Sequence, residues 1–308
     1  MTLKWCIGVF SFSLSVLAIL LNLTIFMPVL RLAFVSRKST IYVIAFFNII
    51  SDLCQLIVTC FLSASIVADR YVFSEERLSS RSVFLGGVFM VAWYMECLVQ
   101  VVMAVNRFTV ITLKRKNIFT FNTTMIIFVF LVMTTLVSGV SNQWIFPCCQ
   151  FIGDHQVMSY MFVAIEGEYS YSNLMLVVYD VLCTLTSTLC YVFVFLTVRT
   201  SHKKQPKNVR NTRSNQDFKY LLQFVFISIF YIFTWVLFEL LPYIVPADKP
   251  EWFAVVPVFI TLNCTSNSVI YLSVNRDVQK SLQIPWLRKK LAGPKNSTVI
   301  NVLPATAT

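Results

Sequence analysis

Long runs of apolar residues, separated by short polar segments, make up most of the chain. A helix needs about 20 apolar residues to cross the hydrocarbon core of a bilayer, and seven such runs carry few or no charged residues. They occupy residues 5–30, 40–68, 83–105, 121–146, 172–198, 220–245 and 252–272. The pattern predicts an all-α membrane protein, a seven-transmembrane helix bundle that forms a single domain over residues 1–290.

The pattern changes after Leu272, where charged residues alternate with apolar ones such as Val278 and Trp286. An amphipathic segment of this kind predicts a short helix on the membrane surface, over about residues 275–288. We expect residues 291–308 to form a short, disordered cytoplasmic tail.

The composition and the placement of charge agree with this interpretation. Charged residues make up 13% of the chain and the mean hydropathy is +0.73, whereas soluble domains contain about 25% charged residues. Of the Lys and Arg residues, 20 lie in alternate segments between the runs and five in the other segments. Because basic residues collect in cytoplasmic loops, we expect the N-terminus outside the cell and the C-terminus in the cytoplasm. The net charge of +11 then indicates contact with membrane lipid and not with nucleic acid.

Several runs contain a polar residue at mid-depth. Asp52 and Glu96 place carboxyl groups in the second and third runs, where a charge costs at least about 2.5 kcal/mol unless it faces a protein interior or a wet cavity. Arg107 follows Glu96 by eleven residues and lies on nearly the same helix face, since a turn takes about 3.6 residues. Asn22, in the first run, is either a lone packing amide or a member of a polar network.

Polar residues also occur in the last three runs. Asn263 and Asn267 are four residues apart, so their amides share one helix face. Asp180 in the fifth run and Glu239 in the sixth could contact a cationic ligand, because both lie in the outer halves of their spans. Trp235, one turn before Glu239, is a third candidate for the ligand pocket.

The outer loop after the fourth run contains two adjacent cysteines, Cys148 and Cys149. The sequence leaves their partners open, because adjacent cysteines rarely bridge each other. Cys6 and Cys60 are the other cysteines expected near the outer surface.

The chain resembles the rhodopsin-like G-protein-coupled receptors over nearly its whole length. The landmarks in the family's order and spacing are Asn22, Asp52, Asn106-Arg107-Phe108, Tyr191, and the stretch from Asn267 to Tyr271. Asn106, Phe108 and Ser268 depart from the family's Asp-Arg-Tyr and Asn-Pro-x-x-Tyr motifs, and the cysteine at the top of the third span is missing. These departures and the Ala-Val-Asn-Arg-Phe signature are most similar to the nematode serpentine chemoreceptors, and we expect class x (Srx).

The resemblance implies a chemosensory receptor of the plasma membrane. The membrane of a sensory cilium is one location that would suit such a receptor. An extracellular small molecule or peptide would bind between the helices and activate a heterotrimeric G protein. Arg107, Asn106, Tyr191, Asn267 and Tyr271 would form the switch. In it, the inner end of the sixth span moves outward and opens a cleft for the G-protein α subunit.

The resemblance also implies an intramembrane polar network of Asn22, Asp52, Glu96, Asn263 and Asn267. Asp52, Asn263 and Asn267 match the family's sodium-binding cluster, in which Glu96 replaces a serine. Oxygen ligands suit such a hard cation, but two close carboxylates can instead share a proton. We favour the shared proton, and we assign no metal and no cofactor.

Two other classes of function are weighed against a receptor. A ligand-gated channel or a small-solute transporter would also use intramembrane acids, but a transporter usually shows internal repeats and this chain shows no convincing one. An enzyme is not expected, because no His-Glu-x-x-His motif occurs and His155 and His202 lie in loops on opposite sides of the membrane. The seventh run contains no lysine that could hold retinal.

Overall fold

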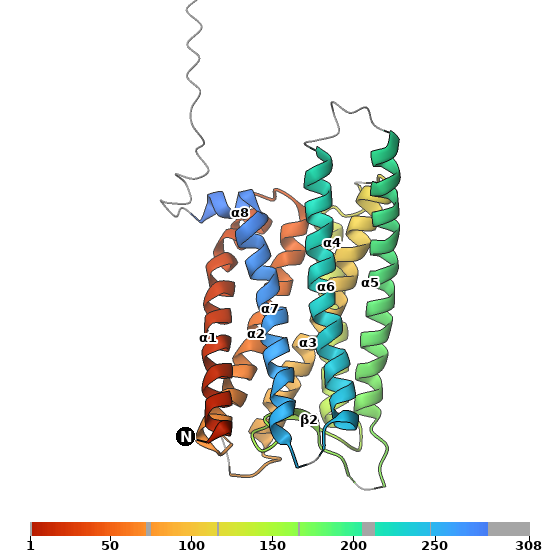
Figure 1. The fold of residues 1–308 in the computed structure, drawn as a ribbon. Coiled ribbons are helices and arrows are strands. Elements are labelled where there is room, and N and C mark those ends of the chain that lie inside the picture. Colours follow the sequence, from red (N-terminus) through yellow and green to blue (C-terminus); the bar gives the residue numbers. More distant parts are fainter. Residues whose placement is uncertain are drawn as a thin grey trace, which may run out of the picture.

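The computed structural model describes residues 2–71, 75–115, 117–165, 167–204, 213–246 and 248–282. Within these ranges, the side chains of residues 201–204, 213–227 and 274 are not described. Seven long helices run side by side (Figure 1): α1 (Leu3–Leu30), α2 (Thr40–Ala68), α3 (Ser80–Arg107), α4 (Phe121–Val140), α5 (Tyr171–Lys204), α6 (Arg213–Ile244) and α7 (Val255–Val274).

The helices have the length and composition of membrane spans. Six of them are long and apolar enough to cross a bilayer, and the described part of α6 adds a shorter apolar stretch, Ser228–Ile244. The predicted seven-helix membrane bundle is therefore confirmed.

Local sequence sets where the first four helices begin. Thr2, Ser39, Ser79 and Thr120 precede α1, α2, α3 and α4, and each side chain accepts a hydrogen bond from a backbone N–H of the first turn. Serine and threonine are favoured at this position because the first N–H groups of a helix have no partner within it.

Short π-helical turns continue three of the helices. They cover Arg31–Val35 after α1, Phe108–Thr112 after α3 and Ser141–Ile145 after α4. The third turn contains two amides, Asn142 and Gln143, that are each 1% exposed. Polar side chains are therefore carried into the bundle at the end of α4.

Helix α3 is the most enclosed of the six long spans found among the described residues. In its most apolar window 72% of the residues are buried, compared with 22% in α5 and 28% in α1. Large apolar side chains point away from the bundle on the outer helices, and Ile126 and Phe130 of α4 are 71% and 70% exposed. Lipid would cover such a surface, so polar groups on α3 are shielded from water while α1, α4 and α5 face the bilayer.

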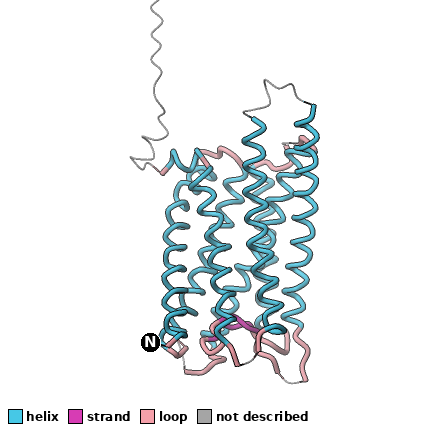
Figure 2. The backbone as a smooth tube through the Cα atoms, viewed as in Figure 1, coloured by secondary structure: helices cyan, strands magenta, loops and turns pink. Residues whose placement is uncertain are grey.

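The two ends of the bundle are built differently. The N-terminus lies at one end with a hairpin of β1 (Phe151–Asp154) and β2 (Ser159–Phe162), and these are the only strands among the described residues (Figures 1 and 2). The strands are antiparallel, with Gly153 opposite Tyr160. The sequence predicted an outer loop here and no strand.

The short helix α8 (Arg276–Ser281) lies at the opposite end (Figure 1). Asn275 caps it by accepting hydrogen bonds from the N–H groups of Asp277 and Val278, and Lys38 forms an ion pair of 2.6 Å with Asp277. The surface helix predicted over 275–288 is described as far as residue 282. Its remainder and the predicted tail, 291–308, lie outside the described residues.

Candidate functional site

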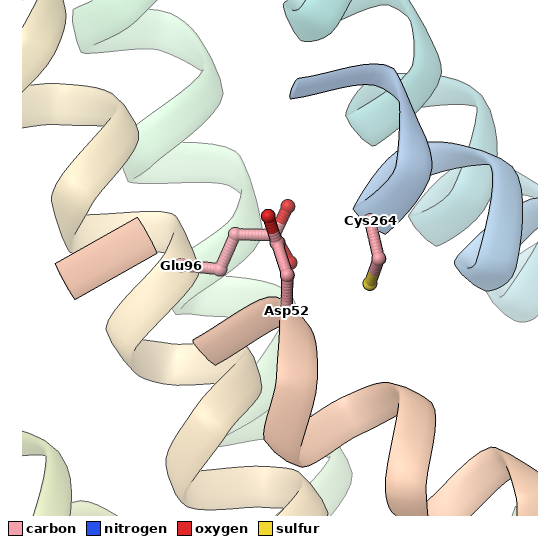
Figure 3. A group of neighbouring side chains, drawn as sticks. All are labelled: Asp52, Glu96 and Cys264. Carbon is pink, nitrogen blue, oxygen red and sulfur yellow. The ribbon is translucent and has the colours of Figure 1, made fainter. Parts of the chain in front are cut away.

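Two carboxyl groups meet in the centre of the bundle. Asp52 of α2 and Glu96 of α3 have no exposed surface, and each has an oxygen within 4.8 Å of the other and of the Cys264 thiol of α7. Figure 3 shows the two carboxyl groups next to each other, with Cys264 facing them from α7. The structure thus brings together the two acids that the sequence places inside the second and third spans.

Amide side chains from two neighbouring helices bind Glu96. Gln55 of α2 donates to Oε2 at 2.7 Å, and Asn263 of α7 donates to Oε1 at 2.5 Å. The Cys264 thiol donates in turn to the side-chain oxygen of Gln55, Oε1, at 3.8 Å. Glu96 is therefore the point where α2, α3 and α7 are joined by hydrogen bonds.

Asp52 has its own pair of amide donors. Asn48 and Asn267 both donate to Oδ2, at 2.9 and 3.2 Å. Asp52 Oδ1 and Asn263 Oδ1 are buried and accept no hydrogen bond from the described residues. Buried acceptors normally have a partner, so a proton held between the carboxyl groups or an oxygen-coordinated cation would each fit the donor set.

Asn22 extends this network to α1. Its side-chain N–H group donates to the carbonyl oxygens of Ala18 and Cys264, at 3.1 and 3.2 Å. Its carbonyl accepts from the Ser268 hydroxyl at 2.7 Å. Asn22 thus fixes α1 against α7, and the lone packing amide considered from the sequence does not describe it.

The residues expected to form the cytoplasmic switch lie at the α8 end of the bundle. Arg107 is the last residue of α3, and its charge acts on the phenol groups of both Tyr191 of α5 and Tyr271 of α7. Asn106 is 7% exposed and, being uncharged, cannot form an ion pair with Arg107. Asn267 lies one turn before Tyr271, so α7 connects the carboxyl pair with this end of the bundle.

A cavity with about 320 Å³ of empty volume lies between the helices near the hairpin, and we call it the inner cavity. Its lining is aromatic and aliphatic except at Asp180 and Thr234: Phe89, Met90, Trp93, Phe151, Tyr160, Leu176, Asp180, Thr234, Trp235, Phe238, Val256 and Ile260. Small-molecule sites in proteins are typically apolar pockets with a few polar groups that orient the ligand. The inner cavity has this chemistry, with Asp180 and Thr234 as the polar groups among its described lining residues.

Asp180 is held in this wall by three donors. Trp93 Nε1 donates at 3.0 Å, the Tyr231 hydroxyl at 2.5 Å and the Cys97 thiol at 3.4 Å. All three reach Oδ1, so Oδ2 accepts no hydrogen bond from the described side chains. This geometry fixes the carboxyl group and leaves one oxygen for another donor.

The other two predicted ligand contacts are placed differently. Trp235 lines the inner cavity together with Asp180. Glu239 is outside the lining, although its charge acts on Asp180. The structure thus joins two of the three predicted pocket residues at one cavity, and Glu239 is not among its described lining residues.

The β-hairpin covers the inner cavity and was not predicted from the sequence. Phe151 of β1 and Tyr160 of β2 both line the cavity, and their rings stack on Phe89 of α3 with centroids 5.5 and 4.3 Å away. Gln143 anchors the hairpin, because its side chain pairs with the backbone of Phe151 and also donates to the Val83 carbonyl at 2.7 Å. The sequence signal that could have indicated a packed outer loop was Gln143, an amide side chain at the end of the fourth apolar run.

Charged groups surround the hairpin on its outer side. Asp154 has no exposed side-chain surface and pairs with Arg77 at 2.7 Å, while the Tyr71 hydroxyl donates to it at 3.1 Å. Burial, reinforced by Asp154, raises the pKa of Tyr71 to about 12. The neighbouring His155 is 6% exposed, and burial together with the positive charge of Lys4 lowers its pKa.

Comparisons with known proteins identify this architecture. The model of the family described as "Serpentine type 7TM GPCR chemoreceptor Srt" matches residues 2–293. The chain belongs to this family. Class x, expected from the sequence signature, is not supported; the matching class is Srt, and the broader assignment to the serpentine chemoreceptors is confirmed. No curated protein shows significant sequence similarity to the chain.

A solved structure supports the same fold for this Srt receptor. The crystal structure of squid rhodopsin superposes with a TM-score of 0.69 and 13% sequence identity, covering 92% of this chain and 86% of that one. At this identity the likeness establishes the rhodopsin-like fold and nothing about the ligand. Together with the family match, it identifies a multi-pass membrane receptor of the chemosensory type.

Two departures from the rhodopsin-like motifs now have a structural explanation in the Srt receptor. Ser268, where that motif has proline, supplies the hydroxyl that binds Asn22. The missing cysteine at the top of α3 means that the usual covalent link to the outer loop cannot form, and Cys148 and Cys149 are instead joined to each other. From the sequence we regarded a bridge between adjacent cysteines as rare, but the structure contains one.

Proposed function

We propose that this receptor binds a small extracellular molecule carrying a cationic or hydrogen-bond-donating group, and that binding activates a heterotrimeric G protein. The observation that carries the proposal is the position of Asp180. It is the one charged residue among those described in the lining of the inner cavity, and the hydrogen bonds that it accepts from the described residues all reach Oδ1. A peptide is less well matched than a small molecule, because the cavity is small and covered by the hairpin.

The chemistry of the cavity supports a specific ligand class. Aromatic walls from Trp93, Trp235 and Phe89 attract both apolar groups and cations, while the carboxylate of Asp180 favours an ammonium group or a donor such as a hydroxyl. Burying a charge without a partner is costly, so an anionic ligand would be excluded. Small amines with an apolar body fit these requirements best.

Coupling to a G protein is supported by the opposite end of the bundle. Arg107 lies between α5 and α7, near Tyr191 and Tyr271, and Asn267 ties α7 to the carboxyl pair through Asp52. A ligand that favours an outward position of α6 would release these contacts and open a cleft for the G-protein α subunit. Such a shift requires different affinities of the ligand for the two states.

The coupling proposal is tested with Arg107→Ala. Cells expressing the wild type or the variant at equal surface density are exposed to a panel of small amines, neutral odorants and peptides, and cytoplasmic signalling is recorded. Arg115→Ala, an exposed basic residue of the same inner segment, is the control. A response that Arg107→Ala abolishes and Arg115→Ala retains supports the proposal. A ligand-gated current that persists in Arg107→Ala under G-protein blockade would instead favour a channel.

The ligand proposal is tested with Asp180→Asn. We expect this variant to lose its response to amines while keeping its surface expression, whereas Glu239→Gln should change the response less because Glu239 is not among the described lining residues. Responses to neutral ligands should survive in both variants. An unchanged amine response in Asp180→Asn would refute the role of Asp180.

The orientation in the membrane follows from the placement of basic residues and is also proposed. We place the N-terminus and the hairpin outside the cell and α8 in the cytoplasm, with the exposed Arg37 and Lys38 at the inner surface beside anionic lipid. An epitope tag before Met1 should then be stained on intact cells, and a tag after Thr308 only after permeabilisation. Reversed staining would refute this orientation and the location of the ligand site with it.

A further inference from the structure

A second cavity lies on the other side of Tyr160. It has about 380 Å³ of empty volume, part of which is open to solvent. It lies between the outer halves of α2 and α3 and the hairpin, and we call it the outer cavity. Val58, Leu62 and Leu85 form part of its apolar wall, and Ser65, Tyr71 and Ser82 contribute hydroxyl groups. Tyr160 lines both the outer and the inner cavity.

The ring of Tyr160 forms the wall between the two cavities. It stacks on Phe89 with the centroids 4.3 Å apart, and its hydroxyl lies 2.9 Å from the hydroxyl of Thr59. The Thr59 hydroxyl donates its hydrogen to the backbone carbonyl of Gln55 at 2.8 Å. Tyr160 is therefore the donor in the hydrogen bond between the two hydroxyls. The Tyr160 ring also stacks on Phe151 with the centroids 5.6 Å apart. One hydrogen bond and two stacking contacts therefore hold the wall in place.

Gly153 keeps the outer cavity open. It lies opposite Tyr160 in the hairpin, and a Cβ atom at this position would be 3.3 Å from Leu62 Cδ1 and 3.5 Å from Tyr160 Cε1. Any larger side chain would extend into the space between these two residues. The cavity thus depends on the smallest residue at one position of β1.

The polar groups of the outer cavity determine what it could hold. None of the described lining residues is charged. The hydroxyls of Ser65 and Tyr71 donate to the Phe61 carbonyl and to Asp154, at 2.9 and 3.1 Å, which leaves their oxygens as acceptors. A charged molecule would lose its hydration without gaining a counter-charge, whereas a hydroxyl-bearing molecule could donate to these oxygens and place its apolar part against Leu62 and Leu85.

We propose that the outer cavity is a second binding site, for a small uncharged amphiphile such as a short-chain alcohol, and that Tyr160 separates it from the inner cavity. The proposal does not require the inner cavity to bind an amine. It predicts two measurable properties: selectivity of the outer cavity for uncharged molecules, and access from the outer to the inner cavity when the ring of Tyr160 is removed.

The first property is tested with Ser65→Cys in the full-length receptor in membranes. Labelling of the introduced thiol is followed by peptide mass spectrometry, which separates it from the native cysteines. Uncharged methyl methanethiosulfonate should label it, the trimethylammonium-ethyl reagent should not, and 1-butanol should slow the uncharged reagent. Adding Gly153→Leu, which fills the cavity, should abolish labelling.

The exposed Gln156→Cys serves as the control, since both reagents should label it with or without butanol. Labelling of Ser65→Cys by both reagents alike, or labelling that neither butanol nor Gly153→Leu affects, would overturn the binding site.

The second property is tested with Val256→Cys, which lies in the wall of the inner cavity. Tyr160→Ala should accelerate its labelling by the uncharged reagent about tenfold, which corresponds to about 1.4 kcal/mol, whereas Tyr160→Phe retains the ring and should change it little. Gly153→Leu should reverse the acceleration. Tyr160→Leu provides a second variant without the aromatic ring if Tyr160→Ala reduces surface expression. No acceleration in either variant, or acceleration that persists with Gly153→Leu, would refute Tyr160 as the partition.

Discussion

The side-chain amide of Gln143 pairs with the backbone of Phe151 in both directions, donating to its carbonyl at 2.8 Å and accepting from its N–H at 3.0 Å. Both residues are almost completely buried, at 1% and 2% exposed. This pair connects the end of α4 to the hairpin that covers the inner cavity. The hairpin is thereby held by polar contacts that a single substitution can remove.

We predict that Gln143→Ala destabilises the receptor. It leaves the N–H and the carbonyl of Phe151 buried without these partners, and each unpaired group costs about 1–3 kcal/mol. The melting temperature of purified receptor should fall, and binding at the inner cavity should weaken with it. Gln156→Ala, which changes an exposed side chain of the same hairpin, should leave both unchanged. Equal melting temperatures for the two variants would contradict this role of Gln143.

A matched pair of glycines tests how closely the hairpin approaches α3. A Cβ atom at Gly86 would lie 1.9 Å from the Phe151 carbonyl oxygen, whereas one at Gly87 would meet the outer edge of the Trp144 ring at 2.8 Å. The backbone at Phe151 cannot move without displacing the hairpin, but Trp144 is 51% exposed and can turn aside. Gly86→Ala should therefore reduce surface expression and thermal stability far more than Gly87→Ala.

The outer rim should be sensitive to acid through His155. Burial and Lys4 lower its pKa in the folded protein, while Asp154 and Asp69 act in the opposite direction. As the pH falls below about 6.5, the unfolded chain therefore binds a proton at this histidine before the folded one does, and stability decreases.

The melting temperature should accordingly fall between about pH 7.5 and pH 5, and the fall should be smaller in His155→Gln. His202→Gln, at the chain's other histidine, is the control. The pKa of Asp69 is lowered chiefly by its hydrogen bond with Lys4. Any effect of Asp69 on the melting temperature therefore occurs at more acid pH than that of His155. An identical pH profile in His155→Gln and the wild type would show that His155 is not responsible.

Two substitutions at Glu96, in the carboxyl pair, should affect the stability of the receptor differently. Glu96→Gln resembles a protonated carboxyl group and keeps an acceptor for Asn263, so a melting temperature close to that of the wild type is expected if the pair shares a proton. Glu96→Leu leaves the amides of Gln55 and Asn263 without an acceptor and should cost about 1–3 kcal/mol for each.

Sodium titration separates the two interpretations of this site. A shared proton predicts that added sodium leaves the melting temperature of the wild type unchanged. A sodium-dependent increase that disappears in both Asp52→Asn and Glu96→Gln would show that a cation occupies the site instead.

The helical part of the fold followed from the sequence because it depends on local rules, whereas the membership of the central network was implied by the resemblance to the rhodopsin-like receptors. The length of the apolar runs indicates the spans, and the spacing of Asn263 and Asn267 places both amides on one face. An acid such as Asp52 or Glu96 is costly to expose to lipid, so its side chain is expected to point into the bundle. These arguments do not need to know which helices are neighbours.

The parts that were missed depend on contacts between distant segments. Nothing local links Trp93 and Tyr231 to Asp180, because that contact requires the rotation of three helices relative to one another. The pairing of Gly153 with Tyr160 likewise depends on a hairpin packed against α3, in a loop that shows no alternation of apolar and polar residues. The sequence could not show that Asp180 lines the inner cavity and Glu239 does not, since both are acids at a similar depth.

The bridge between Cys148 and Cys149 encloses no length of chain. A disulfide stabilises a fold mainly by closing a long loop in the unfolded state, and a link between adjacent residues closes none. The hairpin over the inner cavity therefore owes its place to amide and aromatic contacts, which reducing agents do not attack. In a reducing buffer the ligand site should keep its cover, and the receptor could be purified or assayed there without losing it.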